Sequence, residues 1–360
     1  MKHILCVVIL LGTITHLLHR HAGAGHRVAT LIEISKFSGS RLFIEPRTSP
    51  TLTSRSAEEH CFPYDPKRLV SPKMLYVVGD SETIPLAQEI KEQFSAMQKL
   101  ITLQVSSESP QTPPWWQHSQ YPTVALMSEQ MDDHERLRFK NQWGYEPTQL
   151  RIAADPVVPI VHPSNPLAQR GITLSQLKII FSQTAFPQHS PIRTWKELNL
   201  EGDWKSRPII LHGYDASASL GLYFKNRVLQ GADLSNRVHR HPGSGRVVFT
   251  VGEEKGPIGF TKLSTITPQA EIVPIRVHSR LLHINKNTPL SSAYPLDHYL
   301  YLNLNPQTLP DGVAVELLRF IYSRQGQSFL KDRGYLPLST TMLRQEWNRL
   351  PESPPAPCTT

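Results

Sequence analysis

Short runs of apolar residues recur along the chain, and polar or proline-containing segments separate them. The clearest run is LYVVG at 75–79, and a short apolar run bounded by polar residues predicts a buried strand. The same pattern predicts further strands at 102–106, 123–127, 157–161, 207–211, 246–251, 272–277 and 299–304.

A helix is expected directly after the first strand. Pro85 suits the first turn of a helix, and Ser81 or Thr83 can cap that turn. The apolar residues that repeat at helical spacing behind it are Leu86, Ile90, Phe94 and Met97.

Helical spacing returns between the later strands. The segment 172–181 carries a capping box made by Thr173 and Gln176, and the segments 219–229 and 313–330 show the same periodicity. Strands that alternate with helices indicate βαβ units, and therefore an α/β protein with mostly parallel sheets.

Composition and charge narrow the class of protein. The chain has 360 residues, enough for two lobes that each bury a core. Its formal net charge of +8 suits an anionic ligand, an anionic envelope surface or nucleic acid. Lys and Arg are dispersed, however, and the sequence has no zinc-finger, RNA-binding or helix-turn-helix pattern. No nucleic-acid partner is therefore expected.

Residues 1–25 follow the plan of a secretory signal peptide, with a basic start and an apolar run from Ile4 to Leu18. The run is shorter than the roughly 20 residues that span a bilayer as a helix, which favours cleavage over anchoring. Cys6 lies too early in the run to be a lipoprotein cysteine. We expect cleavage near Ala24 and a periplasmic or secreted protein.

Two cysteines remain after removal of that segment, Cys61 and Cys358, and both lie in proline-rich coil. In an oxidising compartment they form either a disulfide or two free thiols, and the sequence leaves both alternatives open.

Several ordered segments resemble one known family. LYVVGDSETIPLAQEIKEQF is similar to its opening strand, hydroxyl-bearing turn and first helix, and the GYEP and NPL elements resemble its entry into a second lobe. HGYDASASLGLYF, GEEKGPIGFTKL and the late GYLPL turn keep the family's order. From about Lys73 to Leu338 the chain resembles the phosphate-binding proteins of bacterial phosphate ABC importers.

The resemblance implies an α/β, two-lobed type II periplasmic-binding-protein fold with mixed, mostly parallel sheets and a hinge between the lobes. The chain of such a fold crosses between the lobes twice, here near Asp155 and Leu263. The implied parts are a signal peptide at 1–25, an N-terminal extension at 26–72, lobe one at 73–155 and 264–348, lobe two at 156–263, and a disordered tail at 349–360.

A phosphate site of this kind needs no metal or cofactor, because N–H groups at helix N-termini and Ser or Thr hydroxyls hold the oxyanion. The resemblance implies ligands at Ser81 and Thr83, which otherwise read as a helix cap. It also implies Ser128, where the family has a Ser-Arg pair and this chain has Glu129 instead of the Arg. A carboxylate repels phosphate, so Glu129 either points away or indicates a different ligand.

Another expected ligand turn is HGYDASASLGLYF. Aligned on Asp215, the family's Arg falls on Gly213, which removes a fork of charge-assisted hydrogen bonds. Ser217 and Ser219 fall on the family's Ser-Gly-Thr triplet and remain candidate ligands, while capping by Ser217 is the alternative.

The family's glycine-rich turn after the second strand is absent, and SSESPQTPPWWQ replaces it. Trp115 and Trp116 either stack on an organic ligand or partner or cover the lobe edge, and we favour the cover. The cluster His239–His241 lacks metal-ligand spacing and is expected in a solvated loop. The segment 242–246, PGSGR, is expected to be a turn that leads into a strand.

The leading hypothesis is a solute-binding protein, not an enzyme, that captures phosphate or a related oxyanion in a cleft between the lobes and delivers it to an ABC permease in the inner membrane. The altered ligand positions motivate a second hypothesis, an envelope sensor or interaction module that has lost phosphate binding. A phosphatase is a weaker third, because the sequence offers no metal cluster or activated nucleophile.

Overall fold

A computed structural model describes residues 62–69, 71–107, 114–117, 121–183, 192–215, 218–287, 290–307 and 312–350. All of them lie in one compact unit, Arg55–Thr360. The signal-peptide segment, Cys61, Ser217 and Cys358 lie outside the described residues. No helix in the described ranges is both long and apolar enough to cross a membrane.

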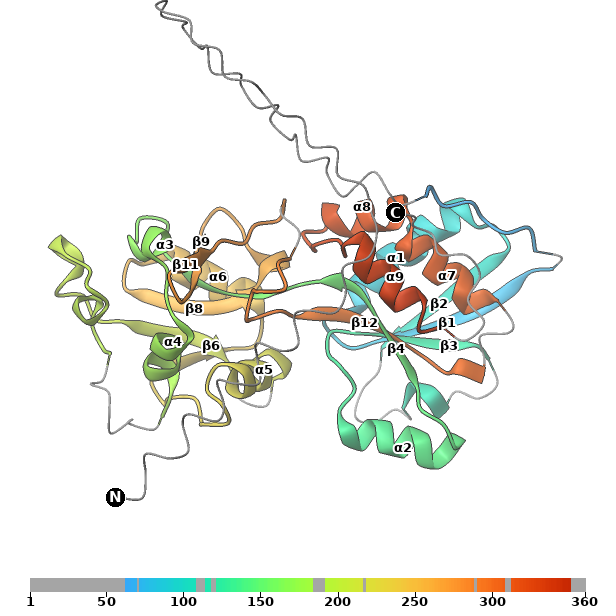
Figure 1. Ribbon diagram of the computed structural model, residues 1–360, viewed down its shortest axis with the longest axis horizontal. Coiled ribbons are helices and arrows are strands. Elements are labelled where there is room, and N and C mark those ends of the chain that lie inside the picture. The colour runs from blue at the N-terminus through green and yellow to red at the C-terminus, as the bar shows by residue number, and fades with distance from the viewer. Residues whose placement is uncertain are drawn as a thin grey trace, which may run out of the picture. The chain divides into compact units, whose positions relative to one another are not determined.

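The first sheet has the strand order β2-β1-β3-β12-β4, and β12 runs opposite to its companions. Its strands are β1 (Lys73–Gly79), β2 (Ile101–Ser107), β3 (Thr123–Met127), β4 (Thr148–Ala154) and β12 (Tyr299–Leu304). The helices beside it are α1 (Ile84–Met97), α2 (Asp133–Trp143), α7 (Val313–Tyr322), α8 (Arg324–Asp332) and α9 (Thr340–Trp347). Figure 1 shows α1, α7 and α9 together on one side of this sheet and α2 on the other.

The second sheet has the order β7-β6-β8-β5-β9, with β5 against the direction of the rest. Its strands are β5 (Val157–Val161), β6 (Ile210–Tyr214), β7 (Val238–His241), β8 (Pro257–Lys262) and β9 (Glu271–Ile272), and β10 (Ile275–Val277) pairs separately with β11 (Arg280–Leu282). The α-helices around it are α3 (Leu167–Arg170), α4 (Leu174–Phe181), α5 (Ser219–Arg227) and α6 (Ser244–Glu253). Short 3-10 turns are η2 (Trp115–Gln117), η3 (Trp195–Leu198), η4 (Gly202–Trp204) and η5 (Leu263–Thr265).

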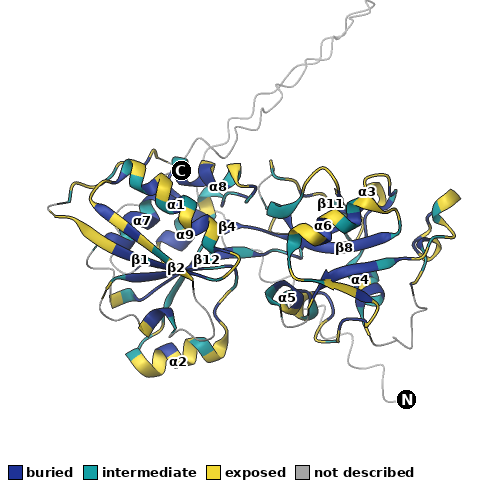
Figure 2. Ribbon diagram, turned by 180° about the vertical axis from the view of Figure 1, so that it is seen from behind, coloured by how far each residue is buried: buried dark blue, intermediate teal, exposed yellow. Residues whose placement is uncertain are grey.

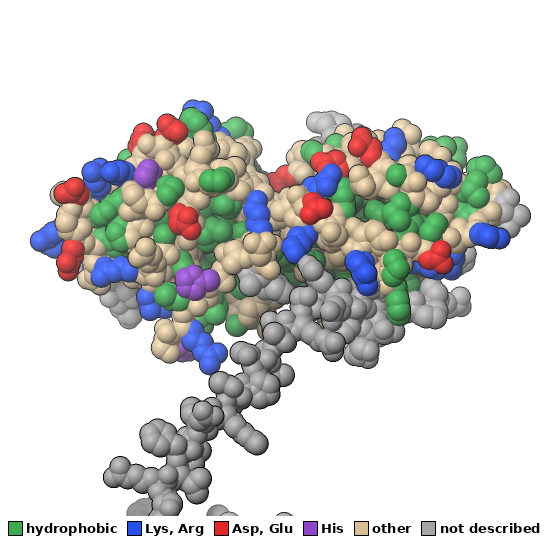
Figure 3. Space-filling view, turned by 90° about the horizontal axis from the view of Figure 1, so that it is seen from above, with side chains coloured by type: hydrophobic (Ala, Val, Ile, Leu, Met, Phe, Trp, Pro, Cys, Tyr) green, Lys and Arg blue, Asp and Glu red, His purple; other side chains and the backbone are tan. Residues whose placement is uncertain are grey.

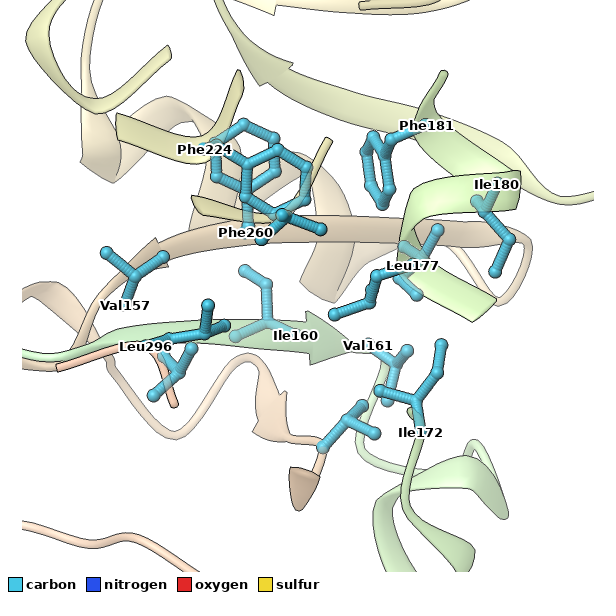
Figure 4. Close-up of a cluster of buried hydrophobic side chains, with 14 of the residues drawn as sticks. Val157, Ile160, Val161, Ile172, Leu177, Ile180, Phe181, Phe224, Phe260 and Leu296 are labelled. Atoms are coloured by element: carbon cyan, nitrogen blue, oxygen red, sulfur yellow. The ribbon is translucent and has the colours of Figure 1, made fainter. Parts of the chain in front are cut away.

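Each sheet has its own hydrophobic core, as the expected α/β fold requires. Figure 2 shows the strands mostly buried and the outer faces of helices such as α2 exposed. In the second core, the rings of Phe224 and Phe260 stack with centroids 3.7 Å apart, and Phe181 packs edge-on against Phe260 (Figure 4). The two sheets of mostly parallel strands confirm the fold class predicted from the sequence.

The chain passes from the first sheet to the second between Ala154, the end of β4, and Val157, the start of β5. The return lies later than the expected Leu263. Strand β9 pairs with β5, and buried side chains up to Leu296 belong to the second core. The two passages run side by side, because the N–H of Asp155 donates to the carbonyl of His298 (2.8 Å).

The segment 246–251, expected as a strand, is instead the middle of α6. Its β-branched residues favour a strand locally, but Val247, Val248 and Val251 face the sheet at helical spacing while Phe249 is 43% exposed. The expected turn in PGSGR is likewise corrected, because Gly243 is the N-cap of α6 and Ser244 begins the helix.

Three other expectations need correction. The strand at 272–277 is split into β9 and β10 around Pro274, which has no N–H to donate to a ladder. The helix at 313–330 breaks at Ser323, whose extended backbone ends α7 and whose side chain caps α8. Residues His239 and His241 lie on the edge strand β7 rather than in a loop.

Candidate functional site

Asp80, which follows β1, organises the turn that leads into α1, ahead of its first residue Ile84. One of its carboxylate oxygens accepts from the N–H groups of Glu82 (3.0 Å) and Thr83 (2.9 Å) and from the Thr83 hydroxyl (3.0 Å). The other oxygen accepts from the N–H (2.7 Å) and hydroxyl (2.8 Å) of Ser128. A negative charge is favourable at a helix N-terminus. The carboxylate of Asp80 therefore occupies donors that the sequence suggested for an external anion.

The expected ligands of this turn differ in their surroundings. Thr83 is buried, and the single hydrogen of its hydroxyl is shared between the Asp80 carboxylate and the nearer carbonyl of Leu126 (2.6 Å). Ser81 is exposed. The side chain of Thr83 does not cap α1, and Asp80 supplies the side-chain acceptor instead. Thr83 and Ser128 thus both donate hydrogen bonds to the carboxylate of Asp80.

Glu129 follows Ser128 at the end of β3 and points to the second sheet, because its carboxylate accepts a hydrogen bond from the Ser219 hydroxyl at the start of α5. Burial raises the pKa of Glu129, and the hydrogen bond from Ser219 and the charge of Lys262 partly oppose this rise. Glu129 therefore does not point away from the expected site. It meets the same helix that the sequence predicted to hold the oxyanion.

Ser219, the first residue of α5, lies within hydrogen-bond reach of Glu129. Ala218 is the N-cap residue and makes no side-chain cap, so the first N–H groups of α5 depend on other partners. Gly213, at the place of the family's Arg, is closed to a side chain, because an added Cβ would lie 2.7 Å from the Phe260 ring.

Lys262 is a residue that the sequence analysis missed. It is the last residue of β8, is only 4% exposed, and forms an ion pair with Glu82 of the α1 turn. The local sequence does not mark Lys262 as a site residue. Its pairing with Glu82 joins residues 180 positions apart, so only the folded chain shows it. Lys262 supplies a positive charge that acts on Glu129.

Asp155, on the first passage between the sheets, is held by Ser264. Its carboxylate accepts from the N–H (2.9 Å) and hydroxyl (2.8 Å) of Ser264. Burial raises the pKa of Asp155, and Lys262 opposes the rise. The charge of Lys262 thus acts on Glu129 at the cleft and on Asp155 at the passage between the sheets.

A cleft of about 570 Å³ opens beside these groups. Its polar lining includes Asp80, Glu129, Arg138 and Asn303, and α5 contributes Leu222. Its remaining lining comes from Pro114, Trp115, Trp116, Met127, Gln130, Met131, Asp132 and Glu135.

Trp115 and Trp116 are buried and pack on Phe139, and both are among the residues that line the cleft. Both tryptophans cover the edge of the lobe, which is the interpretation favoured from the sequence. They also line the cleft. Asp132 and Glu135 form the capping box of α2.

Among the described residues, no three His, Cys, Asp or Glu side chains form a group that could hold a metal ion. On β6 and β7, His212 and His241 share a hydrogen bond (2.8 Å). Over the face in Figure 3, Lys and Arg side chains are interspersed with Asp and Glu, in keeping with their dispersion in the sequence.

Comparison with known proteins places this geometry in context. No family model matches the chain. The phosphate-binding protein PstS of two Pseudomonas aeruginosa strains is 28% identical over 266 residues, which cover 72% of this chain and 82% of the relative.

Solved structures agree on the fold. A putative phosphate ABC transporter substrate-binding protein with bound phosphate from Clostridium perfringens matches with a TM-score of 0.54 and 18% identity, over 74% of this chain and all of that one. An ABC-type phosphate transport receptor from Vibrio cholerae matches with a TM-score of 0.54 and 13% identity, over 74% and 100% of the two chains. The chain is thus similar to the phosphate-binding proteins of ABC importers, as its sequence indicated, and has their two-lobed periplasmic-binding-protein fold.

Proposed function

We propose that the protein is an extracytoplasmic solute-binding protein that captures phosphate or a related oxyanion between its two sheets and delivers it to an ABC permease in the inner membrane. The observation that carries this proposal is the similarity to PstS over most of both chains. The Clostridium perfringens structure is named as an ABC transporter substrate-binding protein and the Vibrio cholerae structure as a transport receptor, so we propose transport rather than catalysis.

The proposed oxyanion seat lies at the N-terminus of α5. Its donors are the hydroxyl of Ser219, the first N–H groups of the helix, and the ammonium group of Lys262. In the structure, Glu129 holds Ser219 and Glu82 holds Lys262. An incoming oxyanion takes over these donors from the two carboxylates. Among the residues expected from the sequence, Ser219 is the direct ligand that we propose, and Thr83 and Ser128 position Asp80.

Isothermal titration calorimetry of the purified protein with phosphate, sulfate and molybdate tests this function. At least one of these oxyanions should bind, and it should raise the melting temperature, because a ligand bound only by the folded state stabilises it. The result that contradicts the proposal is a flat titration with every oxyanion, phosphate esters and phosphonates included.

The Lys262→Met variant tests the seat itself. It should weaken oxyanion binding by about tenfold or more, equivalent to about 1.4 kcal/mol, through loss of a buried positive charge. Lys225→Met is the matched control, since Lys225 pairs with Asp233 elsewhere on the second lobe (2.7 Å). Equal oxyanion affinities of Lys262→Met and Lys225→Met would show that Lys262 is not part of the oxyanion seat.

A further inference from the structure

The cleft beside the proposed seat has more acidic than basic groups. Asp80, Glu129, Asp132 and Glu135 face one guanidinium group, that of Arg138, so the lining has four carboxylates against one cation. Protein donors stabilise the charges of Asp80 and Asp132 but do not remove them. A bare dianion that enters this cleft is repelled at close range, where Coulomb energies are largest.

The cleft also has the size and walls of a site for an organic molecule. Its volume, about 570 Å³, lies within the roughly 300–1,000 Å³ of organic ligand sites. Trp115 and Trp116 form an indole wall, and Met131 and Leu222 add apolar surface. An indole face attracts cations, and Arg138 already lies over Trp116, 5.8 Å from the ring centroid.

Asn303 provides an independent sign of a ligand. Its side chain is fully buried on β12 and lines the cleft. Its oxygen accepts from Gln149 (2.8 Å), but its Nδ2 has no hydrogen-bond partner among the described residues. Buried donors in folded proteins nearly always have partners. An oxygen of a bound molecule fits this unused donor.

We propose, building on the function proposed above, that the ligand is a zwitterionic organic phosphate or phosphonate, an oxyanion that carries an ammonium-bearing substituent. The oxyanion binds at Ser219 and Lys262. The ammonium group lies in the cleft between Glu129 and the tryptophan wall, and a ligand oxygen accepts from Asn303. The ammonium group offsets the acidic lining that opposes inorganic phosphate, and the substituent fills a volume that a tetrahedral anion leaves open.

Calorimetry on the purified protein compares four probes: phosphoethanolamine, glycerol phosphate, inorganic phosphate and ethanolamine. Glycerol phosphate has a similar size but no cation, and ethanolamine has the cation but no oxyanion. Phosphoethanolamine should bind about tenfold more tightly, or better, than each of the other three.

The outcomes separate the two proposals. If inorganic phosphate or glycerol phosphate binds as tightly as phosphoethanolamine, the zwitterion is overturned while oxyanion capture stands. If ethanolamine binds as tightly as phosphoethanolamine, the oxyanion seat is overturned as well. If no probe binds, this inference is overturned.

Two variants locate the contacts. Glu129→Gln should remove most of the preference for phosphoethanolamine over glycerol phosphate, whereas Glu89→Gln, on α1 where Glu89 pairs with Arg333, should keep it. Asn303→Leu should weaken phosphoethanolamine binding by about tenfold while the free variant stays folded, as its urea unfolding curve checks. Retention of the full preference in Glu129→Gln, or of full affinity in Asn303→Leu, overturns the assignment of the cleft.

Discussion

Ser128 donates both its backbone N–H and its hydroxyl to the same carboxylate oxygen of Asp80, at 2.7 and 2.8 Å. The second oxygen of Asp80 holds the turn that leads into α1. One carboxylate therefore joins the ends of the neighbouring strands β1 and β3 to a helix N-terminus. Anions bind well at such places, and here the chain supplies the anion itself.

Asp80→Ala should therefore destabilise the fold while it opens a second seat for an oxyanion. Loss of the acceptor leaves N–H and hydroxyl donors partly buried, at a cost of about 1–3 kcal/mol in the free energy of unfolding. Phosphate affinity should rise by about tenfold, because a negative charge is removed and these donors become available. Urea unfolding and calorimetry measure the two effects.

The matched control for Asp80→Ala is Asp132→Ala. Asp132 also lines the cleft and caps a helix, but the helix is α2, where Asp132 exchanges hydrogen bonds with Glu135. It should lose about 1 kcal/mol of stability through the lost cap, with a much smaller gain in phosphate affinity. Equal gains in the two variants would show that general charge, rather than the seat at α1, controls binding.

Glu129→Gln should bind phosphate more tightly at neutral pH and lose part of the pH dependence of binding. Burial raises the pKa of Glu129, so this carboxyl takes up its proton at a higher pH than an ordinary carboxyl. Wild-type affinity should therefore increase, relative to the variant, as the pH falls through that raised pKa. Calorimetry of both proteins at matched pH values cancels the titration of phosphate itself.

The folding stability of wild type, relative to Glu129→Gln, should also increase as the pH falls. A carboxyl with a raised pKa in the folded state stabilises the fold below its unfolded pKa, and this contribution is lost as the pH rises through the folded value. Glu253→Gln, at the exposed end of α6, is the control and should reproduce the wild-type pH profile. A constant affinity ratio between wild type and Glu129→Gln at all pH values would contradict the role given to this carboxyl.

Phe260→Ala should cost about 3–5 kcal/mol in the free energy of unfolding. The ring is fully buried, stacks on Phe224, packs against Phe181, and fills the space beside Gly213. Phe249→Ala, on the outer face of α6, should change stability by less than about 1 kcal/mol, because its ring is 43% exposed. Urea unfolding compares the variants, and similar losses in both would contradict the packing described for the second core.

Local patterns in the sequence predicted much of the fold but less of the site. Strands β1, β3 and β5 were predicted because their apolar runs are short and bounded by polar residues. The segment 246–251 was misassigned because its β-branched residues favour a strand, and only packing on the sheet shows that it is helical. An apolar pattern indicates which residues are buried, but a short one does not distinguish a buried strand from the buried face of a helix.

The site was harder to predict because its main contacts join distant residues. Ser219 was found through the resemblance, but its partner Glu129 lies 90 positions away. Lys262 was missed, since its pairing with Glu82 depends on how the chain passes between the two sheets. Asp80 looked like part of an ordinary turn, because its bonds to Ser128 require strand order β1-β3.

His298 should make the protein sensitive to acid. It lies on the second passage between the sheets and is 5% exposed. Burial, together with the nearby charge of Lys262, lowers its pKa from 6.5 to about 3. The folded state therefore binds fewer protons than the unfolded state between these two values. His298 contributes stability above pH 6.5 that is lost as the pH falls, by up to about 1.4 kcal/mol per pH unit.

His298→Gln should flatten this loss, and urea unfolding at pH 7, 6, 5 and 4 measures it. The buried Asp155 has the opposite sign, because its raised pKa favours the folded state in acid, but it is present in both proteins and cancels in the difference. His134→Gln, on the exposed face of α2, is the control and should keep the wild-type slope. If His298→Gln also keeps that slope, another group must account for acid sensitivity. The buried His212, whose pKa falls to about 4 through burial and the neighbouring charges of His241 and His239, is then the next residue to test.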